Sequence, residues 1–194
     1  MSKTDIGARS SRPPASGRRR PRRILIAVLA VVLAGVSVLS AHLFVWPGLP
    51  PLPERADVIV QLGGPGDRRA VALALARQGR APLVAISVST DEIDTDWCHA
   101  GRLDQLSVVC FHPAPFTTRG EARAVAEMAE RYGWRSVILV TSRDQAWRAM
   151  LRVSRCFKGK IYIATARLPW YQWPTQIVYQ WGATIKAYTF ETTC

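Results

Sequence analysis

The stretch ADVIVQLGG, residues 56–64, decides how the folded part of this chain is built. Its apolar residues follow one another without the alternation of a half-exposed strand, and two glycines come directly after them. A continuous apolar run is typical of a strand that is buried on both faces, as in a parallel sheet. The glycines predict a turn in which the backbone can come close to a ligand or to a helix.

Similar runs recur along the chain and alternate with helical patterns. The strand-like runs span residues 81–88, 106–112, 136–142 and 160–166, and the helical patterns span residues 67–79, 117–133, 143–157 and 174–190. Gly79 and Gly133 end two of these helices, and residues 89–106 are polar and irregular. The alternation predicts a doubly wound α/β fold with a mainly parallel sheet of about five strands. Ligands bind beyond the carboxyl ends of the strands in such folds.

An apolar segment precedes this domain. Residues 24–46 are 23 residues without a formal charge, and about 20 suffice to cross the hydrocarbon core of a bilayer. The sequence RRRPRR lies directly before them, and clustered basic residues stay on the cytoplasmic side. We therefore expect a basic cytoplasmic tail (1–23), a transmembrane anchor (24–46), a proline-rich spacer (47–54) and an extracytoplasmic domain (55–194). A signal peptide cleaved near Ser40 or Ala41 is the alternative.

The positive charge of the chain is uneven. Of the net charge of +12, +7 lies in residues 1–23. This cluster sets the orientation of the anchor in the membrane, so it does not require a nucleic-acid partner.

Four cysteines agree with export, because an oxidising compartment permits two disulfides. We expect Cys98–Cys110, which closes a local loop, and Cys156–Cys194, which ties the C-terminal segment to the domain. The alternative is a zinc site that uses Cys98, Cys110 and the neighbouring histidines, although their spacing fits no standard structural pattern.

Three polar segments would meet at one edge of the predicted sheet: residues 63–69 (GGPGDRR), 117–121 (TTRGE) and 141–145 (TSRDQ). They supply glycines, hydroxyls and arginines, and each opens a helix, where free N–H groups favour anions. We therefore predict a pocket for a phosphate or a carboxylate. Its candidate residues are Gly63, Gly64, Arg68, Thr118, Arg119, Glu121, Thr141, Ser142, Arg143, Gln145 and Arg148.

Simpler interpretations stay open for parts of this set. Thr117 or Thr118 could be only a helix N-cap, with Glu121 completing a capping box. Arg148 could be a solvated helix residue. Residues 62–64 could be only a turn, since no full dinucleotide-binding or P-loop motif is present. No set of catalytic residues can be assigned, and the sequence identifies no cofactor.

Two further segments have alternative interpretations. The acidic loop TDEIDTD, with Asp91, Glu92, Asp94 and Asp96, is either solvated or binds a hard cation, although it lacks the EF-hand pattern. The aromatic segment LPWYQWP, residues 168–174, packs over the sheet edge, forms a wall of the pocket, or contacts lipid head groups.

The segments ADVIVQLGG with Arg68, TTRGEA and VTSRDQAWRA, in this order, resemble the YdcF-like family of bacterial envelope proteins, which includes SanA- and ElyC-type members. The resemblance covers residues 56–194, and the cysteines and composition suggest a membrane-anchored, actinobacterial-type member. It implies a Rossmann-like fold and a role in cell-envelope or peptidoglycan precursor metabolism, through phosphates such as those of lipid carriers.

The chain departs from the family pattern at four places. The second strand is followed by SVST (87–90) instead of Ser-Gly-Gly, and Gly120 and Glu121 stand where the family has Glu-Asn. Gln145 replaces a histidine, and Gln180 stands in place of an acidic residue of the last helix.

Two functions from different classes follow from these observations. The first is a membrane-anchored domain that binds or processes a phosphorylated envelope precursor. The second is a non-catalytic envelope scaffold with a vestigial pocket, which the replacements at Gln145 and Gln180 favour. A nucleotide-like cofactor such as S-adenosylmethionine is a weaker third option, because no acidic partner for a ribose is clearly placed. Membrane lipids are expected partners through the anchor.

Overall fold

The computed structural model describes residues 19–90 and 95–194. The chain divides into two units, residues 1–39 and 40–194. Helix α1 (Arg19–Ser40) dominates the first unit. In the described part of the chain, residues Pro21–Val45 form one helical stretch that is long and apolar enough to cross a membrane. An anchor and a signal sequence both satisfy this criterion.

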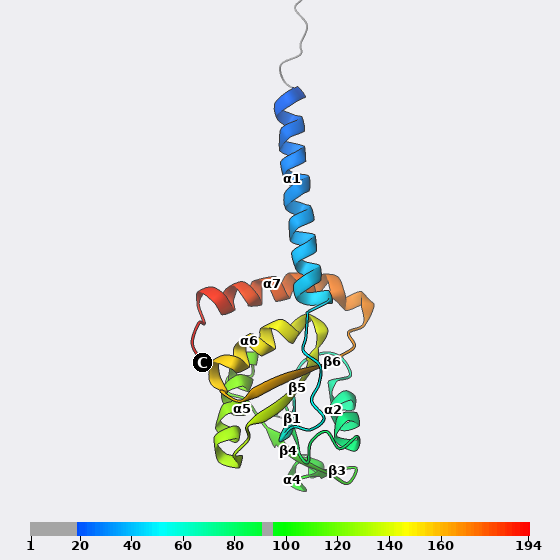
Figure 1. Cartoon of the computed structure of the whole chain (residues 1–194), viewed down its shortest axis with the longest axis vertical. Coiled ribbons are helices and arrows are strands. Elements are labelled where there is room, and N and C mark those ends of the chain that lie inside the picture. The colour runs from blue at the N-terminus through cyan, green and yellow to red at the C-terminus, as the bar shows by residue number, and fades with distance from the viewer. Residues whose placement is uncertain (1–18, 91–94) are drawn as a thin grey trace, which may run out of the picture. The chain divides into compact units, whose positions relative to one another are not determined.

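The second unit is built on one six-stranded sheet in the order β3–β4–β2–β1–β5–β6 (Figure 1). Neighbouring strands are parallel, except that β3 pairs with β4 in antiparallel orientation. The prediction of a mainly parallel sheet is confirmed. The additional strand, β3, has only two residues and lies in the segment that was predicted to be irregular. The strands are β1 (Val58–Gln61), β2 (Val84–Ser87), β3 (Arg102–Leu103), β4 (Leu106–Phe111), β5 (Ser136–Ser142) and β6 (Lys160–Ala166).

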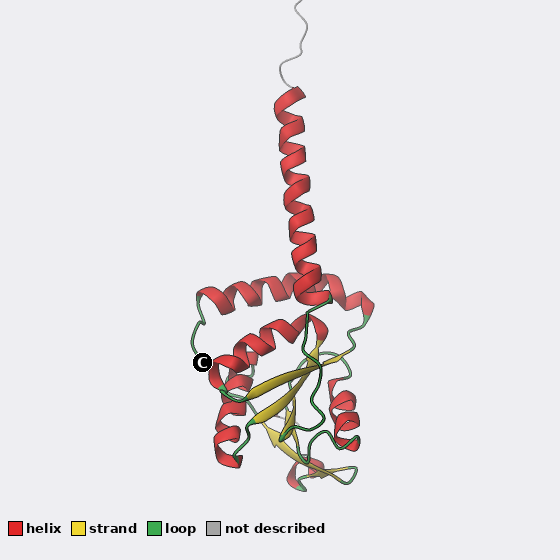
Figure 2. Ribbon diagram, in the orientation of Figure 1, coloured by secondary structure: helices red, strands yellow, loops and turns green. Residues whose placement is uncertain are grey.

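Helices cover both faces of this sheet (Figure 2). Helix α2 lies on one face, α5 and α6 lie on the other, and α7 lies over α6. The short α4 belongs to the segment before β3. The helices are α2 (Arg68–Arg77), α4 (Asp96–His99), α5 (Thr118–Tyr132), α6 (Ala146–Cys156) and α7 (Trp173–Thr189).

The continuous apolar run of the first strand is explained by these two layers. Val58 and Val60 point into the core that α5 and α6 complete. Ile59, between them, points into the core that α2 completes. All three side chains are fully buried. Each residue of β1 therefore removes apolar surface from water, and the strand has no face left for polar residues.

The folded unit begins earlier than the sequence predicted. A π-helical turn, Ala41–Val45, follows α1, and its Phe44 is fully buried. In the proline-rich stretch that was expected to be a spacer, Leu49 packs against the α5–α6 core and Leu52 against the α2 core. Residues 40–54 are therefore part of the domain, because they bring apolar side chains to both of its cores.

Both expected disulfides are present. Cys98 joins Cys110 across the α4–β4 segment, and Cys156 at the end of α6 joins Cys194. The zinc alternative is wrong, because the two cysteines that it needs are bonded to each other. Two disulfides also favour an oxidising compartment for this unit.

Candidate functional site

The carboxyl ends of β1 and β5 lie side by side in the middle of the sheet, where the strand order reverses. The chain leaves β1 toward α2 on one face and leaves β5 toward α6 on the other. Diverging connections of this kind leave a crevice at the sheet edge, which is where open α/β sheets bind ligands. Helix α5 begins beside this crevice, since Gly63 after β1 contacts Glu121 in its first turn.

A cavity of about 520 Å³ occupies this position. Its lining contains five cations and two carboxylates, and the remaining lining residues are neutral. We call it the arginine cavity, and its charged residues are Arg119, Arg123, Arg148, Arg152, Lys186, Glu121 and Glu191. The excess of positive charge in a partly enclosed space favours an anionic ligand.

Arg68 shapes the loop under the cavity and does not reach into it. Only 1% of the side chain is exposed. It donates hydrogen bonds to the carbonyl oxygens of Gly63 and Pro65, and through Nη2 to Ser142 Oγ (2.8 Å) and Gln145 Oε1 (2.9 Å). Burial lowers its pKa to about 10, so the guanidinium is still charged at neutral pH. Arg68 thus ties the turn after β1 to the turn after β5.

Gly64 is required by this arrangement. Its φ is +122°, and a Cβ atom at this position would lie 2.8 Å from Arg68 Nη2. Both the backbone conformation and the close approach of the arginine exclude a larger residue.

A chain of buried hydrogen bonds connects α5, α6 and α7. Gln145 Nε2 and Arg148 Nη1 both donate to Thr118 Oγ1, at 3.0 and 2.8 Å. Arg148 Nε donates to Gln180 Oε1 (2.9 Å), and Gln180 Nε2 donates to Asp144 (2.8 Å). Burial lowers the pKa of Arg148. The interpretation of Arg148 as a solvated helix residue is wrong, because only 7% of it is exposed.

Glu121 is the buried carboxyl group of the cavity. The capping-box alternative is wrong, because Glu121 Oε1 accepts the N–H of Gly63 at 2.5 Å, while Thr117 alone caps α5 by accepting from Gly120 N–H. Burial raises the pKa of Glu121, and the hydrogen bond from Gly63 opposes this shift. The carboxyl group therefore retains a proton more readily than an exposed glutamate does.

The segment after α7 covers one end of the arginine cluster. Nε and Nη2 of Arg119 and Nη2 of Arg123 converge on the backbone oxygen of Cys194, at 3.2, 3.0 and 2.9 Å. Arg152 donates to the carboxylate and to the backbone oxygen of Glu191. Lys186 pairs with the same carboxylate at 3.0 Å. These oxygens satisfy part of the donor capacity of the arginine cavity.

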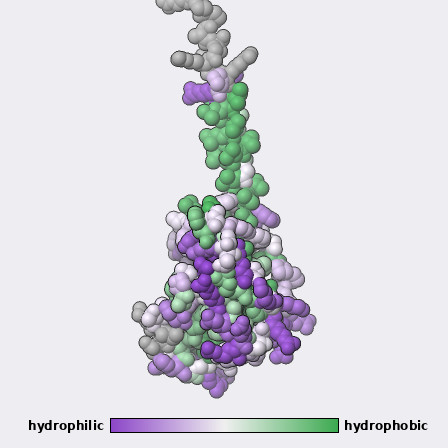
Figure 3. All heavy atoms as spheres, turned by 90° about the vertical axis from the view of Figure 1, so that its left-hand side faces the viewer, coloured by the Kyte–Doolittle hydropathy of each residue, from purple (hydrophilic) through white to green (hydrophobic). Residues whose placement is uncertain are grey.

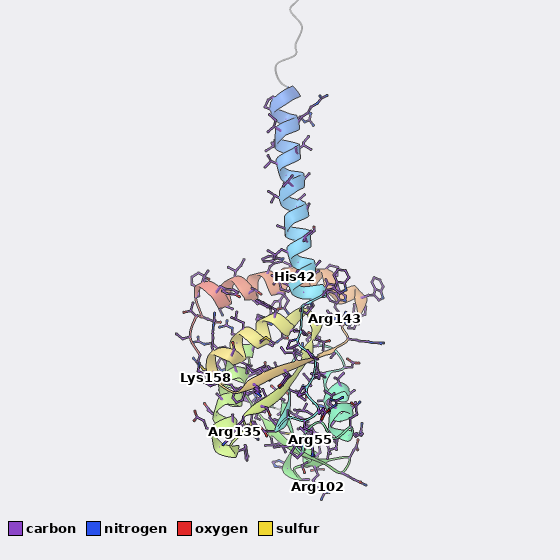
Figure 4. All side chains as sticks on the ribbon, in the orientation of Figure 1. His42, Arg55, Arg102, Arg135, Arg143 and Lys158 are labelled. Atoms are coloured by element: carbon purple, nitrogen blue, oxygen red, sulfur yellow. A yellow bond between two sulfur atoms is a disulfide. The ribbon has the colours of Figure 1, made fainter. Side chains whose placement is uncertain are left out.

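The structure brings most of the predicted residues together at the cavity wall and leaves four outside. Arg68, Thr141 and Ser142 are buried beneath it, where Ser142 accepts from Arg68. Arg143 is exposed on the surface of the domain, because it opens the 3₁₀ turn before α6 with its side chain turned outward (Figure 4). The predicted residues that line the cavity are Gly63, Gly64, Thr118, Arg119, Glu121, Gln145 and Arg148.

The sequence interpretation missed Arg123, Arg152, Lys186 and Glu191. Arg123 and Arg152 each lie four residues after a predicted arginine, Arg119 and Arg148, and residues at this spacing share a helix face. That spacing could have revealed them. Lys186 and Glu191 had no such signal, since their position depends on how α7 packs over α6.

Two other predicted segments are the acidic loop and the aromatic segment. Of the acidic loop, residues 91–94 lie outside the described residues, and Asp96 begins α4. Within residues 19–90 and 95–194, no group of three or more His, Cys, Asp or Glu side chains is arranged to hold a metal ion. In the aromatic segment, Trp170 and Tyr171 are 83% and 64% exposed, so these two rings do not pack over the sheet edge.

No protein-family model matches the chain, and a search of curated proteins finds no match to it.

Proposed function

We propose that the folded unit is a Rossmann-like domain that binds a phosphorylated precursor of the cell envelope. The five parallel strands are arranged as third, second, first, fourth and fifth in chain order, which is the order of doubly wound nucleotide-binding sheets. The resemblance to the YdcF-like family supports the same assignment and supplies the envelope context. The domain is held outside the cytoplasmic membrane by the apolar helix at residues 21–45.

The observation that carries this proposal is the convergence of Arg119, Arg123, Arg148 and Arg152 on one cavity. A guanidinium presents parallel N–H donors that match two oxygens of a phosphate. Lys186 adds a further positive charge, and the first turn of α5 adds a helix N-terminus, which favours anions. A phosphate or diphosphate group meets more of these donors than a single carboxylate does.

Glu121 and the backbone of residues 63–64 form the floor of the proposed binding site. A carboxyl group whose pKa is raised by burial can hold a proton beside a phosphate oxygen. The cavity could therefore either bind or process its ligand, and its residues specify no reaction.

A scaffold without a ligand is the second candidate, and one observation favours it. The arginines already bind protein oxygens, because Cys194 and Glu191 accept hydrogen bonds from Arg119, Arg123 and Arg152. In the scaffold, this network stabilises the end of the domain and has no other role.

Thermal unfolding of the full chain in detergent micelles separates these candidates. We expect pyrophosphate and a polyprenyl phosphate to raise the melting temperature, and sulfate to do so less. Binding stabilises the folded state by mass action, by about 2.7 kcal/mol at a ligand concentration of 100 Kd. If none of these phosphates changes the melting temperature, the scaffold is the better account.

A further inference from the structure

Helix α7 faces solvent with its apolar side. Its buried residues are Gln180, Thr184 and Ala187, which are polar or small. Val178 and Ile185, on the outer side, are 74% and 53% exposed. A helix on a water-exposed surface normally has the opposite arrangement, with the apolar residues turned to the core.

The outward apolar residues form one continuous stripe. They repeat at spacings of three and four, so they lie on one side of the helix. We call this set the α7 stripe, and it consists of Tyr171 in the turn before α7, the exposed Pro174, Val178, Ile185 and Tyr188, and the half-buried Trp181. Lys186 is the only charged residue between 173 and 189, and it turns toward the arginine cavity. Figure 3 shows hydrophobic side chains gathered at the end of the folded unit where Figure 1 places α7.

The stripe is attached to the end of the apolar N-terminal segment. Ser40 and the turn Ala41–Val45 belong to the folded unit and are the last residues of the candidate span. Trp181 of the stripe donates its indole N–H to Ser40 Oγ at 2.9 Å. The ring of Phe44 packs against the ring of Trp181 at 5.6 Å, edge to face. The last residues of the candidate span, Ser40 and Phe44 among them, are therefore already in contact with α7.

We propose that α7 lies in the membrane interface, with the α7 stripe buried among lipid head groups and the upper acyl chains. An uncharged apolar face with aromatic residues at its ends is typical of interfacial helices. Tyr171 and the exposed Trp170 lie at one end, and Tyr188 and the exposed Phe190 lie at the other. This proposal rests only on the anchor in the proposed function and is independent of whether the arginine cavity binds phosphate.

A second copy of the chain could also cover a stripe with this spacing. The hydrogen bond from Trp181 to Ser40 favours lipid over a second chain as the cover of the stripe. It holds the centre of the stripe at the point where the chain would leave the membrane. The interfacial position also brings the arginine cavity to the lipid head groups, since Tyr179, Gln180 and Ala183 of the same helix line that cavity.

Photocrosslinking in vesicles of phosphatidylethanolamine and phosphatidylglycerol tests the proposal. The full chain is reconstituted with the substitution Val178→p-benzoylphenylalanine or Ile185→p-benzoylphenylalanine. The matched control carries Arg102→p-benzoylphenylalanine, at the end of the domain away from α7 (Figure 4). After irradiation, mass spectrometry identifies what each probe has captured.

We expect lipid adducts at positions 178 and 185 and only background at position 102. Capture of a second chain at 178 would overturn the proposal, and so would the absence of any adduct at both stripe positions. Carbonate extraction of the same vesicles reports separately on the anchor. A chain that resists extraction but forms no lipid adduct contradicts only the interfacial helix, whereas a chain that is extracted contradicts the anchor as well.

Discussion

Arg148 connects two helices through a buried side chain, so its removal has a cost that an exposed arginine does not have. In Arg148→Ala, Gln180 Oε1 loses its donor, whereas Thr118 Oγ1 keeps the hydrogen bond from Gln145 Nε2. An unsatisfied buried polar group costs about 1–3 kcal/mol. We expect urea unfolding of the full chain in micelles to show that the free energy of unfolding falls by an amount in this range. Arg143→Ala, on the exposed side, should change the free energy of unfolding by less than about 0.5 kcal/mol. Equal effects of the two substitutions would contradict the buried network.

Glu121 predicts a pH dependence of stability. Its pKa in the folded state is raised above the ordinary value of 4.5, so the folded protein binds this proton more tightly than the unfolded chain. The resulting stabilisation is complete below pH 4.5 and is lost as the pH rises through the folded-state pKa. The isosteric variant Glu121→Gln cannot ionise.

The wild-type chain should therefore lose stability relative to Glu121→Gln as the pH is raised from 4.5 toward neutrality. Parallel urea titrations of the two proteins at several pH values measure this difference. A difference that is constant with pH, or that changes in favour of the wild type, would show that the carboxylate is well solvated or well paired.

Two glycines within helices, Gly120 and Gly182, differ in the space that a larger side chain would find. A Cβ atom at Gly120 in α5 would lie 2.0 Å from the backbone oxygen of Pro115, whereas at Gly182 in α7 nothing lies within 4 Å. Gly182→Ala should stabilise the protein by about 0.5–1 kcal/mol, since alanine is the better helix residue. Gly120→Ala should destabilise it, because the loop at Pro115 must move. Similar melting temperatures for the two variants would contradict the close contact of α5 with this loop.

The two disulfides close loops of different length. Cys156 and Cys194 are separated by 38 residues and Cys98 and Cys110 by 12. In the chain-entropy model these bridges contribute about 4 and about 3 kcal/mol. The Cys156→Ala/Cys194→Ala pair should also free the segment that binds Arg119 and Arg123, so we expect it to be the more destabilising of the two double variants in urea unfolding. The reverse order would mean that this segment contributes little to the fold.

For the whole molecule, the sequence predicted the features that depend on local pattern. Continuous apolar runs such as residues 58–60 predicted the parallel sheet. The polar residues that follow the strands predicted one edge of the cavity. It did not predict features that depend on tertiary packing. Glu121 has the spacing of a capping box, but its carboxylate bonds to Gly63 instead. Arg68 has the position of a ligand-binding residue, but the two turns that it joins enclose it completely.

The C-terminal part of the site could not be predicted for the same reason. The buried side of helix α7 carries the polar residues Gln180 and Thr184, so the usual rule for helix orientation gives the wrong face. Only the packing of Gln180 against Arg148 shows which side of α7 faces the cavity. Lys186 and Glu191 reach the cavity as a consequence of that orientation.

Calorimetric titration of the full chain in micelles with pyrophosphate measures whether the arginine cavity binds phosphate. Arg123→Ala removes a cation that lines the cavity, and Arg143→Ala removes an exposed one outside it. Loss of one charge-assisted contact of about 1.5–3 kcal/mol weakens binding about tenfold or more. We expect this loss of affinity for Arg123→Ala and wild-type affinity for Arg143→Ala. If the wild type does not bind pyrophosphate, or if both variants bind it as tightly as the wild type does, the claim is contradicted.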